Sequence, residues 1–312
     1  MSSTQLITAV IVLLTYAAVA VGSVPYLRMN RATIALVGAV ALVVVGALTE
    51  KQALDAIDVG TILLLGAMMV INVHLRLAGF FNVITGQTLR FARSPRMLLA
   101  LVIFSSGILS AIFLNDPICL MVTPLVVDLT QRLKRDPVPY LIGLGAAANI
   151  GSVATITGNP QNLIIGQASG IPYLTFAAYL APVALMGLVI CWGVIVVLYP
   201  AEFRGSSENQ RLPDVKIPAP RPYTPLLNRI LLITVGLMIA FLLGVPVVTA
   251  ACVAAGLLLI SRLRPQKLLQ LDWDLLAFFA GLFVVTGAIE VSGLSTLMFT
   301  AAAPILKSGI AQ

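Results

Sequence analysis

The sequence predicts an all-α, polytopic membrane protein, and three observations support this fold class. Of the 312 residues, 59% are hydrophobic and only 10% are charged, whereas about a quarter of the residues of a soluble domain are charged. Apolar stretches recur at roughly the 17 to 25 residues that an α-helix needs to cross the hydrocarbon core. These stretches also lack the alternation of polar and apolar residues that is typical of transmembrane β-barrel strands.

Each apolar run bounded by polar residues is expected to contribute helix. In chain order the runs are Leu6–Val21, Ala32–Leu48, Val59–Val73, Met97–Leu114, Ile118–Leu129, Tyr140–Gln167, Leu174–Leu198, Ile230–Leu243, Val245–Ile260 and Leu275–Ile289. Residues 201–225 combine charges with five prolines, a composition that suits a solvated linker. The expected organisation is a first transmembrane repeat over 1–200, with a hairpin at 97–133 and a broken helix at 140–167, then the linker, then a second repeat over 226–312.

The positive charges predict the orientation, because cytoplasmic loops collect Lys and Arg. If the loop with Arg28 and Arg31 is cytoplasmic, every Lys and Arg except Lys51 and Lys307 lies on the cytoplasmic side. The N-terminus is then outside, and the 201–225 linker is cytoplasmic. The net charge of +7 is accounted for by these loops, so no nucleic-acid partner is expected.

A weak internal repeat relates two parts of the chain. Residues 32–80 and 246–294 match in hydropathy at an offset of 214 positions, and Asp58 and Asp272 are one of the identical pairs. By the charge assignment the copies cross the bilayer in opposite directions, as in the inverted-topology repeats of many secondary transporters. At the same offset, the counterpart of residues 97–198 would lie past Gln312, so the second repeat is expected to be incomplete.

The hairpin contains the first polar break in the apolar pattern, Asn115-Asp116-Pro117. Pro117 disfavours helix at the preceding residue, so the chain is expected to turn here. An ionisable residue at membrane depth costs about 2.5 to 3.5 kcal/mol on insertion scales. Asp116 is therefore a candidate functional residue; a helix N-cap is the alternative, and the two roles are compatible.

The second polar break runs from Asn149 to Asn162 and includes Gly158 and Pro160. It is expected to split one crossing helix into two half-helices, whose exposed carbonyls can bind a cation and whose free N–H groups can bind an anion. A kink that serves only packing is the alternative. The candidate binding residues of both breaks are Asn115, Asp116, Asn149, Thr155, Thr157, Gly158, Asn159 and Asn162, with Pro117 and Pro160 as helix breakers.

These two breaks resemble those of the ion transporter superfamily, which includes arsenite permeases, citrate transporters, sodium-coupled dicarboxylate symporters and certain sodium/proton antiporters. The resemblance is carried by Asn115-Asp116-Pro117 and by the segment from Ala148 to Asn162. It implies a re-entrant hairpin whose tip, together with a broken helix, forms a sodium site and one side of the substrate site. A Na+ ion would lie at Asn115, Gly158 and Asn159. The tip differs from that of the dicarboxylate branch and looks more like the arsenite-permease tip.

The leading hypothesis is a secondary active transporter of a small anion or related solute, coupled to H+ or Na+. A Na+/H+ antiporter that uses Asp116, a passive channel and a membrane component that needs a partner are the alternatives. The motifs of primary pumps and membrane hydrolases are absent, so we expect no enzyme activity. No cofactor or metal is expected beyond the coupling ion. The expected partners are the small solute and the lipid bilayer, and a homodimer is an open alternative.

Hydrocarbon cannot satisfy exposed backbone groups, so the hairpin tip and the broken segment are expected to lie together. This arrangement predicts Asn115 within about 15 Å of Asn159, a few helical turns in length. Since the matching elements of the second repeat would lie beyond Gln312, both asparagines are expected to lack some of their hydrogen-bond partners.

Overall fold

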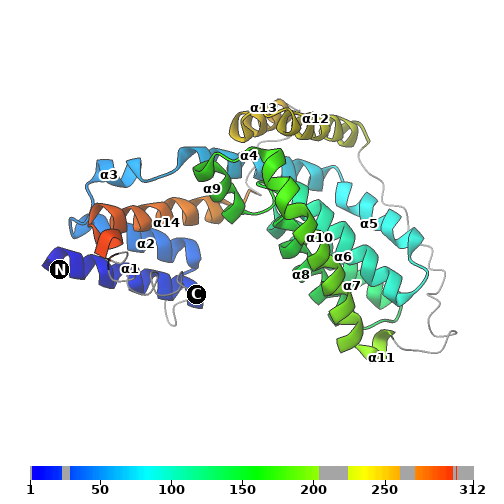
Figure 1. Ribbon diagram of the computed structural model, residues 1–312. Coiled ribbons are helices and arrows are strands. Elements are labelled where there is room, and N and C mark those ends of the chain that lie inside the picture. The colour runs from blue at the N-terminus through cyan, green and yellow to red at the C-terminus, as the bar shows by residue number, and fades with distance from the viewer. Residues whose placement is uncertain (1, 23–28, 204–223, 261–270, 298–299, 301–312) are drawn as a thin grey trace, which may run out of the picture. The chain divides into compact units, whose positions relative to one another are not determined.

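The computed structural model describes residues 2–22, 29–203, 224–260, 271–297 and 300 (Figure 1). Over these ranges the secondary structure is α-helical, with no β-strand, which confirms the all-α fold class. The chain forms two compact units, one from residues 1–62 with 272–312 and one from residues 63–271. In the described part of the chain, six helices are long and apolar enough to cross a membrane: Ser3–Val21, Val59–Leu77, Pro95–Ile112, Tyr173–Leu198, Pro225–Leu242 and Trp273–Val291.

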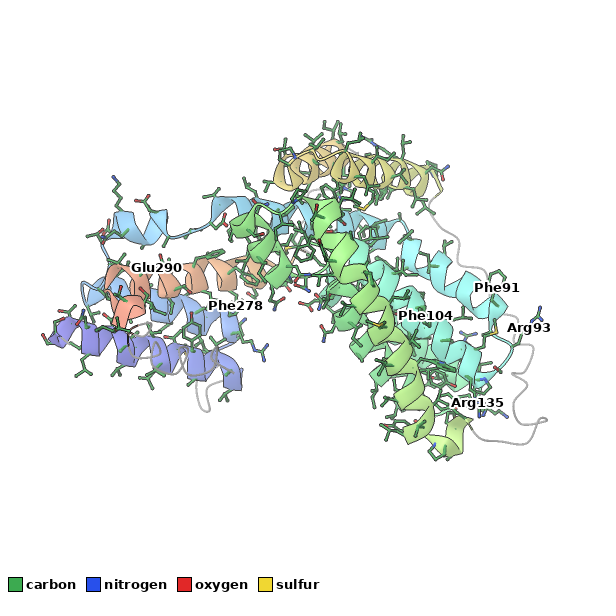
Figure 2. The ribbon with its side chains drawn as sticks, viewed as in Figure 1. Phe91, Arg93, Phe104, Arg135, Phe278 and Glu290 are labelled. Carbon is green, nitrogen blue, oxygen red and sulfur yellow. The ribbon has the colours of Figure 1, made fainter. Side chains whose placement is uncertain are left out.

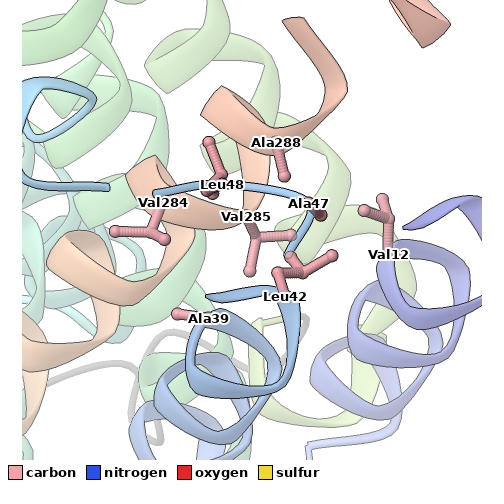
Figure 3. Close-up of a cluster of buried hydrophobic side chains, with 8 residues drawn as sticks. All are labelled: Val12, Ala39, Leu42, Ala47, Leu48, Val284, Val285 and Ala288. Carbon is pink, nitrogen blue, oxygen red and sulfur yellow. The ribbon is translucent and has the colours of Figure 1, made fainter. Parts of the chain in front are cut away.

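The first unit is built on the pairing of two apolar helices, α2 (Arg31–Val44) and α14 (Trp273–Val291), with α1 (Ser3–Val21) packed against both. Small residues let the backbones approach: a Cβ atom on Gly281 would lie 2.8 Å from the carbonyl carbon of Ala35. A cluster of buried side chains fills the space between these helices (Figure 3), and its members are Val12, Ala39, Leu42, Ala47, Leu48, Val284, Val285 and Ala288.

The second unit is centred on α8 (Pro137–Ser152), which contacts α6, α7 and α10. Its helices in chain order are α4 (Val59–Leu77, starting in the first unit), α5 (Phe80–Phe91), α6 (Pro95–Ile112), α7 (Asn115–Arg132), α8, α9 (Pro160–Ser169), α10 (Tyr173–Leu198), α11 (Pro200–Phe203), α12 (Thr224–Leu242) and α13 (Val247–Leu259). The expected hairpin is α6 and α7, and the expected broken helix is α8 and α9.

Three helices were not expected from the apolar runs. Short α3 (Glu50–Asp55) begins with a reciprocal capping box between Thr49 and Gln52, and α5 is amphipathic rather than uniformly apolar. The third, α11, occupies the start of the predicted linker, most of which, 204–223, lies outside the described residues. All three are short or polar, so a search for long apolar segments cannot find them.

The internal repeat extends to local structure. Helix α4 covers 59–77 and α14 covers 273–291, bounds that differ by the same 214 positions at both ends. Asp58 and Asp272 accept from the backbone N–H three residues on, at 3.0 and 3.1 Å. Gly79 and Gly293 both have positive φ and end the two helices. These matched starts and ends support the repeat, while its inverted topology stays a prediction.

A small polar and aromatic cluster joins the base of the hairpin to α8 through α11. The Glu202 carboxylate accepts a hydrogen bond of 2.9 Å from the Tyr140 hydroxyl and lies 3.9 Å from the Arg135 guanidinium. The Phe203 ring is buried edge-on against Tyr140, and its carbonyl accepts a 3.0 Å bond from Arg96. One four-residue helix thus connects the starts of α6 and α8 with the turn after α7.

Replacing Phe203 with Ala should destabilise the second unit, because truncating a buried Phe costs about 3 to 5 kcal/mol. Phe91 (Figure 2) is 61% exposed on α5 and provides the matched control. Thermal unfolding of the purified chain should show a clearly lower midpoint for Phe203→Ala than for Phe91→Ala. Equal midpoints would mean that α11 does not hold these helices together.

Candidate functional site: the hairpin tip and the broken helix

The hairpin turns at Phe113 and Leu114, whose backbones are extended, and α7 begins at Asn115. The expected turn at Asn115 to Pro117 was therefore placed slightly too late. Pro117 lies in the first turn of α7, where its missing N–H removes no helical hydrogen bond. The alternative role of Asp116 as N-cap was also wrong: Leu114 is the N-cap, without a side-chain cap bond, and Asp116 is exposed in the first turn.

The break in the second apolar segment lies between Ser152, the last residue of α8, and Pro160, the first residue of α9. Pro160 starts a helix, because its fixed φ suits the first helical position. Asn159 caps the same helix, and its side-chain oxygen accepts a 2.7 Å bond from the backbone N–H of Asn162. The proline and asparagine that interrupt the apolar run therefore define the start of the second half-helix.

Asn162 satisfies the carbonyls that the break exposes. Its buried side-chain amide lies 3.2, 3.3 and 2.9 Å from the carbonyl oxygens of Ser152, Val153 and Thr155. Asn159 donates a further bond of 3.0 Å to the Ser152 hydroxyl. The expectation of unpaired polar groups on Asn159 was therefore wrong, since both ends of its amide have partners within the break.

The hairpin tip is hydrogen-bonded directly to this break. The backbone N–H of Asn115 donates to the Gly158 carbonyl at 3.0 Å, and its side-chain amide donates to the Asn149 oxygen at 2.9 Å. The Thr155 hydroxyl donates to the Ala111 carbonyl in the last turn of α6. Because Gly158 precedes Asn159 in the chain, the predicted proximity of Asn115 and Asn159 is confirmed.

Two glycines allow the close approach behind the tip. A Cβ atom on Gly151 of α8 would lie 2.1 Å from the carbonyl oxygen of Gly107 on α6. A Cβ atom on Gly158 would lie 2.1 Å from the Ser152 carbonyl oxygen, so the break itself is also tightly folded. A larger residue at Gly151 would push the hairpin and α8 apart, and a larger residue at Gly158 would distort the break itself.

Some polar atoms beside the junction have no protein partner among the described residues. They are the side-chain oxygen of Asn115 and the hydroxyls of Ser106 and Ser110 on α6, all buried. An unsatisfied buried acceptor costs about 1 to 3 kcal/mol. Such oxygens suit a hard cation or a water molecule, whereas no group of three His, Cys, Asp or Glu side chains that could hold a metal ion occurs in the described ranges.

The junction thus brings together most of the predicted residues. Asn115, Asn149, Thr155, Gly158, Asn159 and Asn162 share its hydrogen bonds, while buried Thr157 lies 3.4 Å from the Tyr173 hydroxyl. Asp116 is exposed one residue after the tip. Sequence reasoning did not single out Ser152 within the predicted break, and it missed Ser106, Ser110 and Tyr173, because a hydroxyl in an apolar run gives no pattern until its neighbours in space are known.

The family model described as citrate transporter matches residues 7–311. An uncharacterised transporter of Mycobacterium tuberculosis is 29% identical over 300 residues, covering 91% of this chain and 68% of the relative. The silicon efflux transporter of Oryza sativa is 27% identical over 343 residues, covering 91% of this chain and 70% of the relative. A transporter of Dictyostelium discoideum named arsB is 30% identical over 184 residues, covering 59% of this chain and 33% of the relative.

Replacing Gly151 with Ala should separate the hairpin from α8, because the added methyl group would collide with the Gly107 backbone rather than with a flexible side chain. Gly145 lies on the same helix, and a methyl group added there would meet no atom within 4 Å, so Gly145→Ala is the matched control. Thermal unfolding should show a lower midpoint for Gly151→Ala alone. A decrease of the unfolding midpoint by the same amount in both variants would contradict the close approach of the Gly107 and Gly151 backbones.

Proposed function

Because the chain belongs to the citrate transporter family, we propose that it is a secondary active transporter that moves a small anion or a related solute across the cytoplasmic membrane, coupled to H+ or Na+. The family and the membrane-length helices support a multi-pass membrane transporter rather than an enzyme. The identity of the solute, the coupling ion and the orientation, with the N-terminus outside, are parts of the proposal.

The observation that carries the proposal is the unpartnered Asn115 oxygen at the hydrogen-bonded junction of the hairpin tip and the broken helix. Beside it, the Gly158 carbonyl accepts one bond and keeps a second lone pair. The Ser110 hydroxyl lies in the last turn of α6, next to Ala111, whose carbonyl contacts the break. Neutral oxygens of this kind are the ligands that Na+ would use, and we assign the coupling ion to Asn115, Gly158 and Asn159, with Ser110 as an added ligand.

The solute class follows from the same junction. The first turns of α7 and α9 begin at the tip and at the break, so the positive ends of two helix dipoles lie near the neutral amides. This combination suits an arsenite-like, oxyanion or carboxylate solute. The name of one relative, a silicon efflux transporter, supports a small inorganic solute.

Uptake into proteoliposomes that contain the purified chain tests the proposal. Arsenite, phosphate-like oxyanions and carboxylates such as citrate should be compared with and without Na+ and pH gradients. Uptake of one of these solutes that needs a gradient would support secondary transport. Gradient-independent leakage would favour a channel, and no uptake with any solute would favour a component that works with a partner.

Replacing Ser110 with Ala should weaken Na+ dependence if the hydroxyl is a ligand, raising the Na+ concentration for half-maximal uptake several-fold. If the hydroxyl is only buried and unpaired, its removal should leave transport unchanged and increase the stability of the folded protein. Ser105 on the same helix donates to the Val102 carbonyl, and Ser105→Ala is the control. Unchanged Na+ dependence in Ser110→Ala would remove this residue from the site.

The Na+/H+ antiporter is the second candidate, and Asp116 is the observation that favours it. Its exposed carboxylate lies in the first turn of α7, where the helix dipole stabilises negative charge. Replacing Asp116 with Asn keeps size but removes the titratable charge, and should abolish or uncouple ion-driven transport. Flux measured across a pH series should then lose its pH dependence, and a wild-type rate and pH profile would show that Asp116 is structural.

A further inference from the structure

Helix α4 carries two buried polar side chains that do not belong to the junction, Asn72 and His74. Of the six membrane-length helices in the described ranges, α4 is the most deeply buried: 67% of its apolar span lies inside the structure, against 50% or less for the other five. His74 has no exposed surface, and Asn72 is only 1% exposed. Neither side chain therefore faces lipid, and His74 is the only histidine of the 312-residue chain.

A hydrogen bond of the His74 ring determines which ring nitrogen carries a proton. Nδ1 lies 2.7 Å from the Val70 carbonyl oxygen, one helical turn earlier. A carbonyl oxygen can only accept, so Nδ1 donates, and in the neutral ring Nε2 then carries the lone pair. Nε2 is buried and has no partner among the described residues. The ring thus presents a free proton acceptor inside the second unit.

Asn72 adds a second unpartnered polar group to the same turn of α4. Both the nitrogen and the oxygen of its side-chain amide are buried without a partner in the described part of the chain. Positions 72 and 74 are about 200° apart around a helix of 3.6 residues per turn, so the two side chains leave α4 on opposite sides. Each unsatisfied buried group costs about 1 to 3 kcal/mol. Such groups on both sides of one turn indicate that water reaches this part of the helix.

The internal repeat shows that packing of this helix does not require a histidine. At the offset of 214 positions, His74 corresponds to Ala288 and Asn72 to Thr286, both on α14. Ala288 is fully buried in the apolar cluster of the first unit, and the Thr286 hydroxyl donates to the carbonyl four residues earlier. The second copy therefore packs with a methyl group at the position of the imidazole. This difference points to a role other than packing for His74.

Space for water lies at the end of the same helix, in a cavity of about 270 Å³. Its lining comes from the α4–α5 turn and from α7: Arg76, Gly79, Phe81, Leu120, Met121 and Pro124. A water molecule takes up about 30 Å³ in the liquid, so the cavity can hold several. Arg76 and Leu120 are exposed, so the cavity reaches the surface. Arg76 is two residues from His74, or about 3 Å along the helix axis.

Few charged groups are available to interact with the ring. Helix α4 has no acidic residue, and Arg76 near its end favours the neutral ring because it is positive. On α7, Asp116 and Asp128 lie one turn before and one turn after the residues that line the cavity. The other charges between 95 and 203 lie at helix ends or in α11: Arg96, Arg132, Lys134, Arg135, Asp136 and Glu202. A proton on His74 would therefore change the charge of the α4 core by a full unit.

We propose that His74 is an occluded proton-binding site. Nε2 takes up one H+ from water, and the neutral ring becomes an imidazolium that still donates to Val70 through Nδ1; release returns the proton to water. Histidine suits this role because its charge ordinarily changes near neutral pH. In the transporter proposed above, the site makes solute transport depend on H+. That consequence rests on the proposed function, whereas proton binding by itself does not.

Because the chain has a single histidine, proton binding can be observed directly. The full chain, purified without a histidine tag, is labelled with 15N-histidine, and the two ring nitrogens are followed by NMR in detergent from about pH 9 to about pH 5. Nε2 should change from unprotonated to protonated as the pH falls, while Nδ1 stays protonated throughout. A ring that stays neutral over the whole series would overturn the proposal. This measurement needs no transport activity and no substitution.

Transport by two variants in proteoliposomes tests the consequence. His74→Gln keeps a buried polar side chain but cannot titrate, and solute uptake should lose its dependence on a pH gradient. Thr234→Val is the matched control, because the Thr234 hydroxyl is also buried and unpartnered among the described residues, and uptake should keep that dependence. Equal losses in both variants, or a loss in Asp116→Asn with full retention in His74→Gln, would overturn the proposal. If the wild type takes up no solute while Nε2 still titrates, the proposed function fails and the proton site stands.

Discussion

The second unit depends on hydrogen bonds that satisfy backbone groups where α8 stops and α9 begins. Hydrocarbon offers no partner for a free carbonyl or N–H, and each unsatisfied group costs several kcal/mol. Here Asn162 binds three carbonyls of the break, Asn159 caps α9, and the N–H of Asn115 reaches the Gly158 carbonyl from the opposing hairpin. A helix can be interrupted in this unit only because neutral amides replace the missing helical bonds.

The same interaction fixes the hairpin at one end, and α11 fixes it at the other. At the base, Glu202 and Phe203 bind Tyr140 of α8 and Arg96 of α6. Between the two ends, Gly107 and Gly151 bring the backbones of α6 and α8 into contact. Helices α6 to α9 are thus held at their base, middle and tip. A movement that accompanies transport would therefore carry this group of helices as one body rather than opening it.

The sequence predicted this region well because its breaks consist of residues with strong local preferences. Proline, glycine and asparagine within long apolar runs have few explanations other than a turn or a helix end, and both the hairpin and the break were located from them. The turn itself was placed too late, since Pro117 stabilises the first turn of a helix rather than ending one. The α11 cluster and the buried hydroxyls of Ser106 and Ser110 could not be predicted, because their significance depends on contacts between segments distant in sequence.

The neutrality of the junction bears on how an ion and an anion could be coupled there. Asparagine, serine and backbone oxygens can bind a cation without bringing a permanent charge, so the proposed site without its cation would have little attraction for an anion beyond that of the helix ends. A bound Na+ would add a full positive charge; at about 4 Å and an effective dielectric constant of about 20, it would attract a monovalent anion by about 4 kcal/mol. Coupling of this kind is reciprocal, so the anion would strengthen cation binding by the same factor. A fixed lysine or arginine in place of Asn115 would attract the anion even when no ion is bound, and would therefore weaken the basis for coupling.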